Sequence, residues 1–168
     1  MSELKEHVET AMSVVMDIVA SGEEVSPVVF FIKAGMPNLP IPLKLDTEKN
    51  NTLSRKFVQN FILTFRPDFA VMVTDAYMLT VKAPKEDLDK IRDHYKPGDV
   101  SLSPHRVEAI VVDGAGIGEK CNVIQPYERK GKKIIFLDKV ALPEGGYVDN
   151  VFFGNTFEIL EKEGKVVH

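Results

Sequence analysis

The sequence predicts an α+β fold, in which helices pack on a mainly antiparallel sheet of about five or six strands. Residues 106–140 read as three short extended segments separated by turn signals at 113–118 and 129–132, which is the pattern of a C-terminal three-stranded meander. Apolar residues recur at three- and four-residue intervals near the N-terminus and again after residue 50, as in amphipathic helices. The length of 168 residues suits a single domain, 1–168, that buries a hydrophobic core without metals or disulfides.

Three helices are expected from these patterns. The first covers about 3–20 and the second about 48–65, where Pro67 biases the preceding residue away from helical conformation and ends the run. A last helix is expected to begin after Asn155 as N-cap, with Glu158 three residues further on as in a capping box, and to end at Gly164. The first two apolar stripes consist of Leu4, Val8, Ala11, Val15 and Ile18 and of Leu53, Phe57, Phe61 and Phe65.

Two strands are expected before the second helix. We predict an inner strand at 27–34 and an irregular edge strand at about 39–45. The second segment is placed at an edge because Pro40 and Pro42 each remove a backbone donor that a central strand needs.

The second half of the chain is predicted to be mostly extended. If 69–82 forms one strand, Asp75 lies on its more apolar face, whereas a bulge or tight turn at 74–75 would reset the alternation. Residues 83–105 hold three prolines and many charges, and they are expected to form an irregular loop or lid. The meander strands are expected at about 106–113, 119–127 and 132–139.

Composition excludes several classes of protein. Hydrophobic residues make up 44% and charged residues 27% of the chain, as in ordinary globular domains. The net charge of -4 argues against general nucleic-acid binding. The N-terminal residues are acidic and amphipathic, unlike a secretory signal, and the longest apolar stretch is too short to span a membrane. We therefore expect a cytoplasmic location and no partnership with nucleic acid or membrane.

No motif for catalysis or cofactor binding is found in the sequence. The glycine cluster at 114–118 has Glu119 where a dinucleotide fingerprint needs its third glycine, and the following residues predict a strand instead of a helix. Cys121 is the only cysteine, and it is more typical of a small buried apolar residue than of a nucleophile. His7, His94 and His105 show no spacing typical of metal ligands. No cofactor and no metal are therefore expected.

Asp75 is the leading candidate for a functional residue. A carboxylate on a buried face is costly unless it is paired, and such groups gather at functional sites as well as in structural bridges. Arg106 and Glu108 share one face of the next predicted strand, so we expect Asp75 to pair with Arg106. The candidate ligand-binding residues are Asp75, Tyr77, Arg106 and Glu108.

An aromatic and apolar cluster precedes the last helix. It either covers the core or forms an exposed patch through which two copies of the chain associate. The basic residues at 129–133 are expected to form a charged hairpin turn. The candidate interface residues are Tyr147, Val151, Phe152 and Phe153.

The sequence thus favours a non-catalytic, cytosolic binding or assembly module that forms homo-oligomers or binds another protein. The alternative is a small enzyme or ligand-binding protein whose pocket lies between the sheet and the 83–105 segment. Long irregular loops inside compact domains are often functional, which keeps this alternative open. The sequence alone identifies no ligand or partner.

Overall fold

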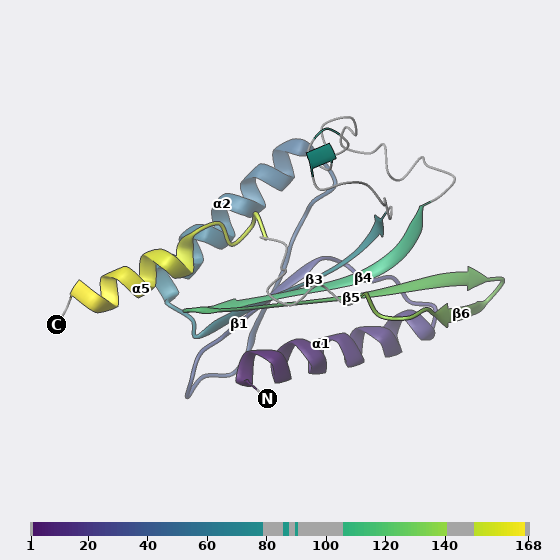
Figure 1. Ribbon diagram of the computed structural model, residues 1–168, viewed down its shortest axis with the longest axis horizontal. Helices are drawn as coiled ribbons and strands as arrows, with labels where there is room; N and C mark the ends of the chain where they lie inside the picture. Colours follow the sequence, from purple (N-terminus) through teal and green to yellow (C-terminus); the bar gives the residue numbers. More distant parts are fainter. Residues whose placement is uncertain (1, 79–85, 88–89, 91–105, 141–149, 167–168) are drawn as a thin grey trace.

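The computed structural model describes residues 2–78, 86–87, 90, 106–140 and 150–166 (Figure 1). The predicted α+β class is confirmed, because helices pack on a six-stranded antiparallel sheet. In chain order the elements are α1 (Glu3–Ala20), β1 (Val28–Ile32), β2 (Leu39–Pro42), α2 (Glu48–Phe65), β3 (Phe69–Met78), β4 (Val107–Gly116), β5 (Glu119–Lys130), β6 (Lys133–Phe136) and α5 (Thr156–Val166).

The molecule has three layers. The strands follow the order β2-β1-β3-β4-β5-β6, and each is antiparallel to its neighbours. Helix α1 covers one face of the sheet, whereas α2 and α5 lie together on the other (Figure 1). Each face therefore has its own apolar core, one beneath α1 and one beneath α2 and α5.

Helix α1 spans the residues that the sequence predicts. Ser2 caps it, since its Oγ accepts a hydrogen bond from the backbone N–H of Lys5 at 3.2 Å. The helix contacts β3, β4, β5 and β6, which leaves the other half of the same sheet face without a described helix. The side chains that it buries are Leu4, Val8, Met12, Val15 and Val19.

Helix α2 also begins and ends as predicted. The Oγ1 atom of Thr47 accepts a hydrogen bond from the N–H of Asn50 at 3.0 Å, which caps the start of the helix. At the other end Arg66 adopts a left-handed conformation with φ 54°, and Pro67 follows. Val58 and Ile62 of this helix are fully buried on the sheet.

The prolines of β2 block one edge of the sheet. The N–H of Leu43 donates to the carbonyl of Pro27 at 2.9 Å. Because the direction of N–H groups alternates along an antiparallel strand, those at 39 and 41 face β1 and the positions at Pro40 and Pro42 face outward. Proline has no N–H, so this edge presents no donor at either position, as expected for an edge strand.

A proline also lies inside the sheet, where a side chain compensates for it. The carbonyl of Pro126 in β5 accepts a hydrogen bond from the N–H of Leu137 at 2.9 Å. Proline has no N–H, so Pro126 cannot donate the reciprocal hydrogen bond to the carbonyl of Leu137. The Nε2 atom of Gln125 donates to the carbonyl of Leu137 at 2.6 Å in its place. This bond explains why a glutamine that is only 2% exposed occurs in an otherwise apolar region.

The glycine cluster lies in the β4–β5 hairpin, as predicted, but the turn is shorter than expected. Gly116 pairs with Glu119, so only Ile117 and Gly118 form the loop, and Gly118 takes a φ of 70°. Gly114 lies beneath α1, where an added side-chain carbon would be 2.5 Å from Cγ2 of Val8. At Gly116 the same carbon would be 2.9 Å from the carbonyl oxygen of Asp68. The glycines are therefore required for close packing and for a turn.

Residues 69–78 form one continuous strand, which decides between the two alternatives left open by the sequence. Asp75 consequently shares the α1 face of the sheet with Val71 and Val73. Residues 79–85 and 91–105, which include most of the expected lid, lie outside the described residues. No helix among the described residues is long and apolar enough to cross a membrane.

Candidate functional site

The four candidate ligand-binding residues lie close together on the sheet. Asp75 and Tyr77 belong to β3, Glu108 of β4 pairs with Tyr77, and Arg106 immediately precedes β4. The guanidinium of Arg106 lies over the ring of Tyr77, 5.1 Å from its centroid. Asp75, Tyr77 and Glu108 are on the α1 face, because they alternate with residues of the opposite face.

The partner that the structure describes for Asp75 is Tyr127 of β5, and not the expected Arg106. The Tyr127 hydroxyl donates to the Asp75 carboxylate, with distances of 2.9 and 2.8 Å to its two oxygens. Arg129 joins the same network, since its Nε donates to Oε2 of Glu108 at 2.7 Å. Its Nη2 also lies 3.4 Å from the hydroxyl of Tyr127.

Burial controls the protonation of this network. Desolvation raises the pKa of Asp75 above its ordinary value, Glu108 adds to the rise, and the hydrogen bond from Tyr127 opposes it. Burial, followed by the hydrogen bond and charge of Asp75, raises the pKa of Tyr127 far above its ordinary value. Tyr127 therefore keeps its proton and acts as a donor, which makes it unsuitable as a base or nucleophile at neutral pH.

The network consists of groups that satisfy one another. Tyr127 is 1% exposed, and its ring packs in the core beneath α1 while its hydroxyl reaches Asp75. The sequence prediction placed Tyr127 at the end of the second meander strand and Arg129 in the basic turn after it, and it identified neither as a partner of Asp75 or Glu108. We interpret the network as the polar end of the α1-side core.

The candidate interface residues differ in burial. Phe152 and Phe153 are 8% and 4% exposed and belong to the core beneath α2 and α5. Of the two alternatives given by the sequence, these two residues therefore cover the core and do not form an exposed patch. Val151 is 54% exposed, and Tyr147 lies outside the described residues.

A second polar cluster fixes the segment before α5. The Nδ2 atoms of Asn122 and Asn150 donate to the two carboxylate oxygens of Asp113, and Oδ1 of Asn150 accepts from the N–H of Phe152 at 2.8 Å. Burial raises the pKa of Asp113, and the two amide hydrogen bonds oppose the rise. The cluster holds Phe152 and Phe153 against the sheet, which is a structural role.

Two other kinds of candidate group are the lone cysteine and possible metal ligands. Cys121 is partly buried, and burial raises the pKa of its thiol, which disfavours the nucleophilic thiolate. Among residues 2–78, 86–87, 90, 106–140 and 150–166, no group of three His, Cys, Asp or Glu side chains is arranged to hold a metal ion.

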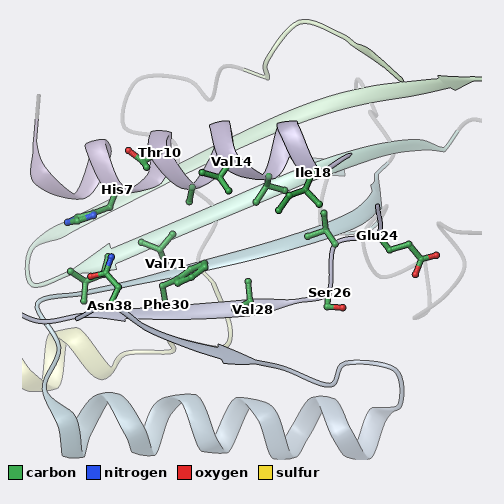
Figure 2. Close-up of a pocket in the computed structure, with 14 residues that line it drawn as sticks. His7, Thr10, Val14, Ile18, Glu24, Ser26, Val28, Phe30, Asn38 and Val71 are labelled. Atoms are coloured by element: carbon green, nitrogen blue, oxygen red, sulfur yellow. The ribbon is translucent and has the colours of Figure 1, made fainter. Parts of the chain in front are cut away.

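An apolar concave site lies elsewhere, between α1 and β1 (Figure 2). It is a half-open groove of about 380 Å³ on the α1 face of the sheet. It exists because α1 covers β3 to β6 and leaves the same face of β1 uncovered. Its apolar lining consists of Ala11, Val14, Val15, Ile18, Val25, Val28, Phe30, Ile32 and Val71.

Polar side chains occur mainly at the two ends of this groove. His7, Thr10 and Asn38 lie near one end, and Glu24 and Ser26 lie near the other (Figure 2). The apolar middle runs along α1 from the first end to the second. A groove with this lining can hold an elongated apolar molecule whose polar atoms lie at its ends.

Sequence reasoning did not identify this groove. Most of its residues come from the amphipathic helix α1 and the apolar strand β1, and each of these patterns is also that of ordinary core residues. The exposure of Val14, at 53%, becomes visible only when α1 is placed on the sheet. Comparison with protein-family models, curated proteins and solved structures finds no match to the chain.

Proposed function

We propose that the protein is a non-catalytic binding module that holds a small, elongated and mostly apolar molecule in the groove between α1 and β1. The observation that carries this proposal is the combination of volume and lining. At about 380 Å³ the groove falls within the range typical of small-molecule sites. Such sites are mainly apolar and have a few polar groups that orient the ligand, as this groove has at its ends.

The described polar clusters support a binding role over a catalytic one. In the part-buried Asp75–Tyr127 pair and the exposed Glu108–Arg129 pair, donors and acceptors satisfy one another. A general base or nucleophile needs instead a group that is free to exchange a proton with a substrate. Among the described residues that line the groove there is one carboxylate, Glu24, and one histidine, His7, and they lie near opposite ends.

A series of straight-chain alcohols tests the proposal. The rise along α1 from His7 to Ile18 is about 16 Å, which leaves room for an extended alkyl chain. Binding of n-hexanol, n-octanol and n-decanol would be measured by isothermal titration calorimetry. Each added methylene should tighten binding by about two- to fourfold, since full burial of one CH₂ contributes about 0.8 kcal/mol.

A pair of variants locates the binding site. Val14→Glu introduces a charge at the rim of the groove and should weaken n-decanol binding at least about fivefold. Ser13→Glu places the same charge on an adjacent exposed position that does not line the groove, and it should bind like the wild type. If no alcohol binds to folded wild-type protein, or if both variants bind equally well, the proposal is wrong.

A further inference from the structure

The charges around the groove select among apolar ligands. Of the described residues that line it, Glu24 carries a formal negative charge, and none is a lysine or arginine. Glu24 is exposed at the end of the groove next to Ile18 and Ser26 (Figure 2). A cation placed at this end would meet a carboxylate.

Helix α1 adds to the negative potential at the same end. It ends at Ala20, close to Ile18 of the groove lining, and its last turn contains Asp17 but no basic residue. The carbonyl end of a helix carries a partial negative charge that favours cations within the last turn. Glu23, adjacent to Glu24, contributes a further exposed carboxylate.

The opposite end of the groove does not favour an anion. His7 lies there, but its Nε2 is already 3.7 Å from a carboxylate oxygen of Glu3. Thr10 and Asn38 are neutral. An anionic headgroup would therefore approach a carboxylate at either end, whereas a cationic headgroup finds a favourable position beside Glu24.

We infer that the ligand is a single-chain amphiphile with a cationic amino group, whose hydrocarbon chain lies along α1 and whose ammonium lies beside Glu24. This inference rests on the proposed function, because it names the ligand class of the same groove. The ammonium stays at the open end, where it keeps its water, and the chain covers the apolar lining. The contribution of Glu24 is modest, since exposed ion pairs are weak and are screened by salt.

Three ligands of equal chain length separate the headgroup from the chain. Binding of n-decylamine, n-decanol and n-decanoic acid would be measured at pH 7 by calorimetry, below the concentrations at which they form micelles. The amine should bind about two- to fivefold tighter than the alcohol, and the acid should bind weaker than the alcohol. High salt should reduce the preference for the amine and leave binding of the alcohol unaffected or slightly stronger.

Matched variants assign the preference to one carboxylate. Glu24→Gln should remove most of the advantage of the amine over the alcohol, measured as the ratio of their two dissociation constants in the same variant. Glu23→Gln removes an equal charge from a neighbour that does not line the groove, and it should have the smaller effect. Both positions are exposed, so both variants should fold.

The possible outcomes distinguish this inference from the proposed function. If the alcohol binds but the amine has no advantage, or if the acid binds best, the inference is wrong and the proposed function stands. If none of the three binds, the proposed function is wrong. A wild-type dimer that Val14→Glu converts to a monomer would also overturn the inference, because a second copy of the chain would then occupy the groove.

Discussion

Replacing Gly114 with alanine tests how closely α1 packs on the sheet. The added carbon would lie 2.5 Å from Cγ2 of Val8 and 2.9 Å from Cδ1 of Leu4, whereas carbon atoms pack best at about 3.5–4.0 Å. Val8 and Leu4 are both fully buried, so neither has free space to move into. The helix must therefore shift, or these side chains must leave their preferred conformations.

The expected cost follows from these contacts. Overpacking by one carbon costs about 1–3 kcal/mol, and alanine recovers about 0.5–1 kcal/mol relative to glycine in a strand. The net loss should be about 1–2 kcal/mol, which lowers Tm by about 3–6 °C for a chain of this size. Differential scanning calorimetry measures this change. The matched control is Gly164→Ala, where the added carbon meets no atom within 4 Å and should stabilise α5 slightly.

A double-mutant cycle identifies the cause of the loss. Val8→Ala removes two methyl groups from the contact, so its combination with Gly114→Ala should be less destabilising than the sum of the two single changes by about 1 kcal/mol. An unchanged Tm for Gly114→Ala would refute the close packing. Additive effects would place the strain at another contact.

Four further predictions concern the polar network, the compensated proline and self-association. Asp75→Asn should stabilise the protein at pH 7 and have little effect at pH 3. The pKa of Asp75 is higher in the folded state than in the unfolded state, so the stability of the wild type falls as pH rises from about 3.8 through the folded pKa. Asparagine carries no charge at either pH and avoids this loss. Urea unfolding at both pH values measures this, and a loss of several degrees in Tm at pH 7 would instead support a stabilising ion pair. Tyr127→Phe leaves the Asp75 carboxylate without its described donor and should lower the free energy of unfolding by about 1–3 kcal/mol, so an unchanged urea midpoint would contradict the network. Gln125→Leu leaves the carbonyl of Leu137 without the amide that replaces the proline N–H and should cost about 1–2 kcal/mol in the same assay, so an unchanged free energy of unfolding would contradict this role of Gln125. The predicted homo-oligomer should have a mass above the 18.8 kDa of one chain in light scattering, and a single-chain mass at high concentration would contradict this prediction.

The elements of the fold could be predicted because local patterns determine them. Helices α1 and α2 have the boundaries expected from their stripes, capping positions and the proline after the second helix. Pro40 and Pro42 place β2 at an edge because proline cannot donate to a neighbouring strand on either side. These are properties of short segments, and they do not depend on how distant segments meet.

The candidate site could be predicted only in part, because it depends on contacts between distant segments. Alternation predicts that Arg106 and Glu108 share one face of their strand, but it does not say which polar side chain lies within reach of Asp75. The choice of Tyr127 over Arg106 as the described partner depends on the register of β4 with β5. The groove depends on how far α1 lies from β1, a distance that no periodicity encodes.

The placement of α1 has a consequence for synthesis on the ribosome. Residue 107, where β4 begins, follows residue 20, where α1 ends, by 87 positions. At a translation rate of roughly 5–20 residues per second, synthesis reaches the start of β4 roughly 4–17 s after α1 is complete. An isolated helix of this length is only marginally stable in water. During that interval the N-terminal segment is exposed to chaperones and proteases, and its capture by a holdase would delay docking until translation is nearly complete.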